Sequence, residues 1–442
     1  MPRWLIIPVE VKHREFLSRI VISALATKRN YRVILGKDTM IRRLAPCLPK
    51  GVLFDKSLGI ARHGKPQRFS KLGYNLVVHD EESTGFYGSP EQFLSVRLAE
   101  ETLEACKRWY CISDELNNAA SVRYSNHQDR FLTSGLLRTD VWRKPLQGFY
   151  QERRREISQE HGPFILFNSN FGGIIHARGD AFVQKQIRGQ KTAYAAVDQR
   201  TAKIFQEGRK NLDAFIDIIP KVARSFPNHK LVIRPHPSEE PSFWVEQFAN
   251  FDNIVISGEG EATPWILASE AMFHHGCTTG IEAAILGKAQ SMYAPHPDAH
   301  HDTDVMQAFS RIHHSQNELL DWISRELQNK TEGSENVKAG EKFFANISGA
   351  LVSETILDDI DTFSFDVTQP IPSALPLSIK LRLFLADRKK RSEKEVQYAT
   401  QKWPGTTTQE ILEKLEITAD GLGLEKNFSV REAFPQVFEI SA

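Results

Sequence analysis

Short apolar runs recur through the first part of the chain, and polar turns separate them. These runs predict strands at residues 4–9, 31–35, 52–54, 74–78, 109–112 and 131–133. Between the first two, apolar side chains from Phe16 to Leu25 are spaced as on one face of a helix, and residues 94–106 predict another helix. Strands that alternate with helices in this way are typical of a parallel, doubly wound α/β sheet.

A second series of the same kind follows the polar stretch 147–162, which we interpret as a linker between domains. Strands are predicted at residues 164–168, 230–234 and 271–273, and helices at residues 196–226 and 318–328. The pattern therefore predicts a second α/β domain of similar size.

Beyond Pro370 the composition changes. A connector interrupted by prolines leads into a basic helix over residues 379–403, and Thr407 and Glu410 have the spacing of a capping box before another helix. We predict three parts: an N-terminal Rossmann-like domain over residues 1–150, a second Rossmann-like domain over residues 160–345, and a helical tail over residues 346–442 that packs back on the first domain.

Composition narrows the class of protein. A chain of 442 residues is too long for one ordinary core, and 41% hydrophobic with 25% charged residues is usual for a soluble globular protein. The net charge of +1 gives no general attraction to nucleic acid, and the basic residues are not interleaved with aromatic ones, so no nucleic-acid partner is expected. The four cysteines lack metal-binding spacing, no apolar run is long enough to span a membrane, and a cytoplasmic location is expected.

The first candidate site is the turn after the strand at residues 230–234. Arg234 is followed by His236 between two prolines, which stiffen the loop and aim the imidazole away from the strand end. Arginine and histidine at a strand's carboxyl end suit a phosphate. The residues expected to bind there are Arg234, His236, Pro237, Ser238 and Glu239. The alternative is a rigid turn in which His236, Ser238 or Glu239 only caps the next helix.

The second candidate site is the turn after the strand at residues 271–273. Glycines allow close approach of a ligand, and hydroxyls beside free helix-start amides favour an anion. The residues expected to bind are His275, Gly276, Thr278, Thr279, Gly280 and Glu282, the last through ribose hydroxyls. The alternative for Glu282 is an acid favoured by the helix dipole. Cys277 is interpreted as a small packing residue.

A third polar turn opens the second domain at Asn168, Ser169 and Asn170, where side-chain amides could contact the phosphate or the sugar. Simple turn chemistry is the equally weighted alternative. We expect the turns that carry His236 and Thr279 to meet above one sheet, where they would grip the phosphate of a leaving group.

In the first domain, three acids follow a predicted strand. A carboxylate among Asp80, Glu81 and Glu82 could act as base toward an acceptor hydroxyl or as a nucleophile, and the pKa of at least one should be raised by its neighbours. The sequence does not choose between Glu81 and Glu82, and a solvated acidic loop is the alternative. Glu10, Arg14 and Arg138 are candidate supporting residues.

Another group of titratable residues lies further along the chain. It comprises His296, His300, His301, Asp302 and Asp304. Its spacing does not match a zinc helix, so we interpret it as a polar loop and predict no metal site.

Several of these segments together resemble a known family. LIIPVEVKHREF, HDEES, LTSGLLRTDVW, FILFNSNFGG, RPHPSEE and KWPG occur in the order typical of the bacterial surface carbohydrate (capsule or lipopolysaccharide) biosynthesis proteins. The chain is also distantly similar to the transferases that use CMP-activated 3-deoxy-D-manno-octulosonic acid (Kdo) in capsule and O-antigen synthesis.

The resemblance implies a GT-B glycosyltransferase, with two Rossmann-like domains facing a cleft. The second domain would bind the nucleotide sugar, CMP- or UDP-linked and with CMP-Kdo as the leading candidate, and the first would bind a saccharide or lipid-linked acceptor. His236 and Pro237 would hold the CMP phosphate. No metal and no separate cofactor are expected. The alternatives are a nucleotide-sugar 2-epimerase of similar fold and a non-catalytic nucleotide-sugar binding protein.

The basic tail helix leaves one question open. Leu381, Phe384 and Leu385 form an apolar stripe beside the cationic run at residues 388–391. Such a helix can lie on the anionic inner face of a membrane. It can equally pack the tail onto a domain and leave its cations solvated.

Overall fold

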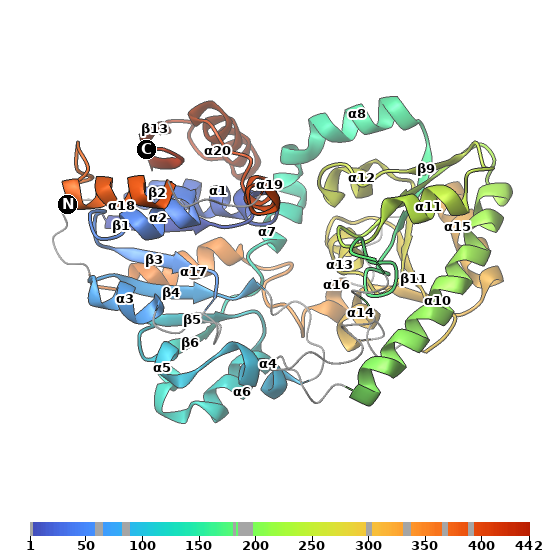
Figure 1. Ribbon diagram of the computed structural model, residues 1–442, viewed down its shortest axis with the longest axis horizontal. Coiled ribbons are helices and arrows are strands. Elements are labelled where there is room, and N and C mark those ends of the chain that lie inside the picture. Colours follow the sequence, from blue (N-terminus) through green and yellow to red (C-terminus); the bar gives the residue numbers. More distant parts are fainter. Residues whose placement is uncertain are drawn as a thin grey trace. The chain divides into compact units, whose positions relative to one another are not determined.

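A computed structural model of the chain describes residues 3–57, 65–81, 89–179, 183, 198–297, 303–329, 337–364, 370–387 and 393–442. The chain divides into two compact units (Figure 1). Unit 1 comprises Met1–Phe149 and Lys342–Ala442, and unit 2 comprises Tyr150–Glu341. Each unit is built on its own sheet.

The sheet of unit 1 has the strand order β13-β14-β2-β1-β3-β4-β5-β6. The six strands that come first in the sequence are parallel. They are β1 (Arg3–Val9), β2 (Tyr31–Lys37), β3 (Val52–Asp55), β4 (Asn75–His79), β5 (Arg108–Cys111) and β6 (Phe131–Thr133). The direction in which strands are added reverses after β2, so β1 and β3 flank the topological switch point of this sheet. Every strand predicted in this region is confirmed.

Helices connect these strands. They are α1 (Lys12–Lys28), α2 (Asp38–Leu44), α3 (Lys65–Lys71), α4 (Pro90–Arg97), α5 (Glu100–Leu103), α6 (Asp114–Arg123) and α7 (Thr139–Trp142), with 3₁₀ turns η3 (Ser125–Arg130) and η4 (Lys144–Tyr150). Since crossovers are right-handed and the strand direction reverses after β2, α1 and α2 lie on opposite faces. The single helix predicted at residues 94–106 is wrong. Leu98 is extended between α4 and α5, and the Tyr124 hydroxyl donates to its carbonyl at 2.6 Å, which stabilises the break.

The tail contains helices and a hairpin. The helices are α17 (Val352–Asp361), α18 (Leu377–Asp387), α19 (Glu393–Lys402) and α20 (Thr408–Leu422), and the strands are β13 (Ser429–Phe434) and β14 (Val437–Ser441). A purely helical tail was therefore the wrong expectation. Gln436 takes a left-handed conformation (φ 58°) that closes the turn. Strand β14 pairs antiparallel with β2, and most of its side chains are buried. The hairpin covers an edge of the sheet that would otherwise be exposed.

Unit 2 has six parallel strands in the order β12-β11-β10-β7-β8-β9. They are β7 (Phe164–Asn168), β8 (Lys230–Arg234), β9 (Ile254–Ile256), β10 (Ala271–His274), β11 (Gln290–Tyr293) and β12 (Arg311–His313). This is the strand order of dinucleotide-binding sheets, and its switch point lies between β7 and β10. The predicted fold class, two doubly wound Rossmann-like α/β sheets, is confirmed.

The helices of unit 2 are α8 (Gln151–His161), α10 (Asp198–Ser225), α11 (Pro241–Gln247), α12 (Ala262–Ala268), α13 (Thr278–Ile285), α14 (Asp304–Phe309), α15 (Gln316–Asn329) and α16 (Val337–Gly340). The polar stretch interpreted as a linker is thus largely the regular helix α8. The hydrophobic core of unit 2 is rich in aromatic rings. The Phe167 ring stacks on those of Phe215 and Phe273, with 4.9 and 5.0 Å between ring centroids. None of the described helices is long and apolar enough to cross a bilayer.

Candidate functional site

The three polar turns predicted in unit 2 lie at one edge of its sheet. Because β7, β8 and β10 are neighbouring parallel strands, the turns after Asn168, Arg234 and His274 all leave from their carboxyl ends. The turn after β7 lies between the other two. The switch point of such a sheet is where ligands bind.

Glu239 joins two of these turns. Its carboxylate accepts hydrogen bonds from Ser169 Oγ (2.8 Å), from the Phe171 backbone N–H (2.6 Å) and from Trp244 Nε1 (2.8 Å). Burial raises the pKa of Glu239 to about 7, although its three donors act in the opposite direction. Glu239 and Ser169 thus hold the β8 turn against the β7 turn, and their contact with a ligand stays a prediction.

His236 is a half-buried residue of the turn after β8. The Ser238 backbone N–H donates to its Nδ1 (3.2 Å), and Ser238 Oγ lies 2.7 Å from the same atom. Nδ1 is therefore the acceptor, so the proton of the neutral ring lies on Nε2. A Cβ added at Gly172 would lie 1.9 Å from Ser238 Oγ, so the glycine lets the β7 turn approach this pair closely. Pro237 is exposed beside it.

The β10 turn is fixed from two sides. Asn170 Nδ2 donates to the carbonyl of Gly276 (3.2 Å), and Gly276 has a positive φ of 52°. A Cβ at Gly280 would lie 2.3 Å from Nε2 of the buried His274, so only glycine lets α13 start this close to β10. The N-cap residue Cys277 makes no side-chain capping bond to α13. Thr278, the first residue of α13, is exposed, and Thr279 is half-buried.

Arg234 is directed toward the loop after β9. Its guanidinium donates to the carbonyls of Glu259 (2.9 Å) and Gly260 (3.0 Å) and lies 5.1 Å from the centre of the Trp265 ring. Burial lowers the pKa of Arg234 to about 10, with partial compensation from Glu282. Its contact with a phosphate stays a prediction.

Three further candidates make contacts within the protein. The Glu282 carboxylate accepts a hydrogen bond from the Thr263 hydroxyl, and its contact with a ribose stays a prediction. The His275 ring is buried and stacks on Phe171 at 4.9 Å. Asn168 is also buried, with Nδ2 3.3 Å from Met272 Sδ. Polar groups of this edge that reach the surface include those of the His236 turn, of Asn170 and of the start of α13.

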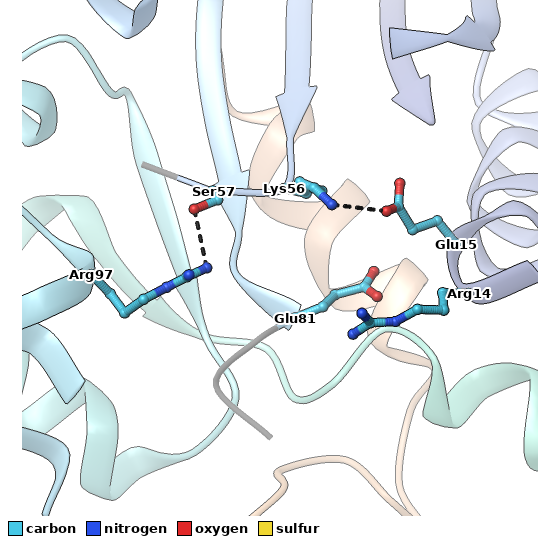
Figure 2. A pocket seen from close by; sticks show the side chains of 6 residues that line it. All are labelled: Arg14, Glu15, Lys56, Ser57, Glu81 and Arg97. Atoms are coloured by element: carbon cyan, nitrogen blue, oxygen red, sulfur yellow. Dashed lines mark hydrogen bonds and ion pairs between the residues drawn. The ribbon is translucent and has the colours of Figure 1, made fainter. Parts of the chain in front are cut away.

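Unit 1 has a small pocket at its own switch point. Figure 2 shows the six side chains that line it: Arg14, Glu15, Lys56, Ser57, Glu81 and Arg97. They follow β1, β3 and β4 at the carboxyl edge of the sheet, except for Arg97, which ends α4. Such a position is where an open α/β sheet binds a ligand.

Glu81 lies between two arginines. Its Oε1 is 3.0 Å from Arg19 and its Oε2 is 3.3 Å from Arg138, and Arg14 points toward it in Figure 2. Burial would raise the pKa of Glu81, but Arg19 and Arg138 outweigh it, so its pKa lies below the usual value. Burial likewise keeps His79 neutral by lowering its pKa to about 4.

Asp80 points to the other side of the strand end. Arg97 binds both of its oxygens, at 2.8 and 3.0 Å, and the Ser57 hydroxyl lies 3.3 Å from one of them. Asp80 is therefore held in an ion pair, while Glu81 lines the pocket. Glu82 lies outside the described residues. The choice among the three acids as catalytic residue stays a prediction.

A chain of ion pairs links this pocket to the tail. Lys56 contacts Glu15 (3.1 Å) and Glu10 (2.8 Å), and Glu10 also contacts Lys402 (2.7 Å) in the KWPG segment. Burial opposes it, but the two lysines lower the pKa of Glu10 to about 2. Trp403 packs edge-on against the Phe16 ring, 6.4 Å between centroids, so the tail borders the start of α1.

Sequence reasoning missed Arg19 and, among the residues that line the pocket, Glu15, Lys56, Ser57 and Arg97. Arg19 had a signal, because an arginine inside the apolar run of α1 is rarely buried unless it is paired. Lys56 and Arg97 had no such signal, because only the arrangement of strands and helices in the fold brings them to the site. Within the described residues, no group of three or more His, Cys, Asp or Glu side chains is placed to bind a metal ion. His300, His301 and Asp302 lie outside those residues.

No protein-family model matches the chain, and no curated protein matches its sequence significantly. Among solved structures it is similar to a UDP-GlcNAc 2-epimerase of Methanocaldococcus jannaschii in complex with UDP-GlcNAc and UDP, with 10% identity, 81% of this chain and 99% of that chain covered, and a TM-score of 0.47. It is also similar to the wall teichoic acid polymerase TagF, with 12% identity and a TM-score of 0.47; the match covers 87% of this chain and 90% of that chain. A third similar structure is the Anabaena protein HepE in complex with UDP and glucose, with 11% identity and a TM-score of 0.41; the match covers 82% of this chain and 100% of that chain. At such identities, the residues of this chain have to support any functional conclusion.

Proposed function

We propose that the protein is a glycosyltransferase that moves a sugar from a nucleotide-sugar donor to a saccharide or lipid-linked saccharide acceptor. The donor would bind at the carboxyl edge of unit 2. The acceptor would bind at the carboxyl edge of unit 1, where Glu81 lies. The nucleotide sugar is the substrate, and the proposed chemistry needs no further cofactor and no metal ion.

The observation that supports the donor site is the linkage of three turns around the switch point of unit 2. Glu239 and Asn170 hold the β8 and β10 turns against the β7 turn between them, so the three turns are held together before a ligand binds. They present the His236 ring with its proton on Nε2 and the uncapped start of α13. Both can donate hydrogen bonds to phosphate oxygens and stabilise the departing nucleotide.

The proposed role of Glu81 follows from its charge. With its pKa below the usual value, Glu81 is ionised at neutral pH and is a weak base, since a strong general base has a pKa near the working pH. A fixed carboxylate can orient an acceptor hydroxyl and stabilise positive charge that develops on the sugar. Glu81 would act in this way.

The family resemblance makes CMP-Kdo the first donor to test. The decisive measurement is turnover on a panel of CMP-, UDP- and GDP-linked sugars, with the released nucleotide and the transferred sugar both quantified. Conversion of a nucleotide sugar without an acceptor, followed by NMR, would indicate a 2-epimerase instead. Binding without any turnover would leave a nucleotide-sugar binding protein.

Two neighbouring glycines provide a matched test of the donor site. Ala at Gly172 would displace Ser238 from His236, whereas a Cβ at Gly173 has nothing within 4 Å. We expect Gly172→Ala to weaken nucleotide binding about tenfold, the value of one charge-assisted hydrogen bond, and Gly173→Ala to leave it unchanged. Equal affinities for the two variants would place the nucleotide elsewhere.

A further inference from the structure

One face of helix α18 packs against the rest of unit 1. Ile379 is 4% exposed, and the helix packs against α2. Four large apolar side chains of the same helix are exposed, namely Leu377 (81%), Leu381 (56%), Phe384 (51%) and Leu385 (58%). The stripe, for which packing onto a domain and contact with a membrane were the two alternatives, therefore faces outward. The cationic run at residues 388–391 lies outside the described residues.

The positions on the helix show a second, ordered face. At 3.6 residues per turn, the four exposed apolar side chains fall within an arc of about 100°, on the side opposite Ile379. Lys380 and Arg382 are both exposed and fall on either side of this arc. The result is a continuous apolar stripe with a positive border on each side.

A single exposed leucine is ordinary, but a contiguous apolar stripe marks a surface that another phase or molecule covers. Apolar side chains that enter the boundary between lipid headgroups and acyl chains are best bordered by lysine and arginine. The long stems of these residues stay with the apolar layer while their charges reach anionic headgroups. The stripe of α18 has this arrangement.

We propose that α18 docks unit 1 on the surface of an anionic lipid bilayer, with the apolar stripe inserted and Lys380 and Arg382 at the headgroups. The proposal goes beyond sugar transfer and does not depend on it. Charge favours a lipid surface over a second copy of the chain. A twofold contact centred on the stripe would bring the positive borders of both copies together, which is unfavourable.

The experiment is co-sedimentation of the full chain with vesicles, without any nucleotide sugar. Vesicles of phosphatidylcholine alone are compared with vesicles that also contain phosphatidylglycerol. We expect binding to the anionic vesicles, weaker binding at higher salt, and little binding to the neutral ones. Absence of binding to the anionic vesicles, or equal binding to both kinds, would overturn the proposal.

Two sets of variants locate the contact. Leu381→Glu is expected to lower partitioning about tenfold, whereas Val122→Glu, at an 81% exposed position on α6, is expected to leave it unchanged. Lys380→Gln and Arg382→Gln should each lower it about fivefold, and the same change at the exposed Lys210 and Lys338 should have no effect. Binding that Leu381→Glu leaves intact would remove α18 from the contact.

Self-association is measured in parallel by sedimentation velocity. A dimer that Leu381→Glu dissociates, with no binding to vesicles, would assign the stripe to a second copy and overturn the lipid proposal. A failure of the sugar-transfer assay would leave the vesicle result unaffected, because the two readouts share no ligand.

Discussion

The two sheets present different chemistry at their carboxyl edges. At the edge of unit 1, charged side chains pair with one another: Glu81 with Arg19 and Arg138, and Asp80 with Arg97. At the edge of unit 2, turns are joined by hydrogen bonds from neutral donors to the buried carboxylate of Glu239 and to the Gly276 carbonyl, and by close contacts at glycines. Similar folds therefore support a fixed array of charges in one unit and a surface of backbone donors in the other.

This difference separates two tasks. Charges held by their partners cost little to reorganise during a reaction, so the unit 1 edge suits the stabilisation of charge that develops on a substrate. Backbone donors at a helix start bind an anion without a permanent positive side chain, so the unit 2 edge suits a phosphate that arrives and leaves. The following predictions test this contrast, from the largest expected effect to the smallest.

Glu81→Gln should have the largest effect. Loss of its charge removes the proposed transition-state contact, so we expect transfer to fall about 10³-fold while nucleotide affinity is unchanged. Steady-state kinetics and nucleotide titration measure the two quantities separately. Glu115→Gln, at an exposed position in the first turn of α6, is the control.

The loss of an ion-pair partner for the buried Arg19 also predicts a lower melting temperature for Glu81→Gln. Activity is therefore compared at a temperature where the variant is folded. Full transfer activity by the folded variant would contradict the role assigned to Glu81.

Glu239 should make unit 2 sensitive to pH. Its folded pKa of about 7 lies above the unfolded value of 4.5, so its contribution to stability is fully present below pH 4.5 and is lost as the pH rises through 7. A shift from 4.5 to 7 corresponds to roughly 3 kcal/mol at its limit. Amide hydrogen exchange of residues 164–175, measured from pH 5 to pH 8 and corrected for intrinsic rates, reports this loss for unit 2 alone.

Glu239→Gln is the companion variant. The amide cannot titrate, and its NH₂ would face the Trp244 N–H, so we expect lower stability by about 2 kcal/mol with no dependence on pH in this window. Identical pH profiles for variant and wild type would show that another group is responsible.

Gly280→Ala should have an intermediate effect. The new methyl group would overlap Nε2 of His274, which also lies 2.9 Å from Gln290 Oε1, so α13 must move away from β10. We expect a loss of about 2 kcal/mol in the free energy of unfolding and weaker nucleotide binding. Gly258→Ala, where a Cβ has nothing within 4 Å, is the matched control for thermal unfolding.

Lys402→Met should have the smallest effect. It breaks the half-exposed ion pair with Glu10, and we expect a loss of no more than about 1 kcal/mol at neutral pH. The folded pKa of Glu10, about 2, lies below the unfolded 4.5, so the wild-type contribution is present above pH 4.5 and is lost as the pH falls through 2. The difference between variant and wild type, measured by denaturant titration, should therefore shrink on acidification.

The sequence was sufficient to predict the parallel strands of unit 1 and strands β7, β8 and β10 of unit 2, because apolar runs and turn residues are local signals. His236 and the start of α13 were found in this way, and the shared sheet edge follows from parallel strands. Strands β9, β11 and β12 were not predicted. The direction of a long side chain is not local. Arg234 turns to the loop at Glu259 because the β9 connection lies next to β8, which is visible only once the strand order is known.

The charged edge of unit 1 was harder to predict for the same reason. Arg19, Lys56 and Arg97 come from separate segments that the fold brings together. Lys56 and Arg97 look like ordinary surface residues in their own stretches of sequence, and Arg19 alone of the three stands out, inside an apolar run. The hairpin at residues 429–441 was missed because its burial depends on pairing with β2, some 400 positions earlier in the sequence.

The pairing of β14 with β2 has a consequence for biosynthesis. Unit 2 is contained entirely between the two segments of unit 1, so it can fold while the ribosome is still translating residues beyond Glu341. The open side of β2 has no partner strand until residues 437–441 have left the exit tunnel. Nascent chains that stop before this point would expose a buried-type strand edge, and we expect them to depend on chaperones.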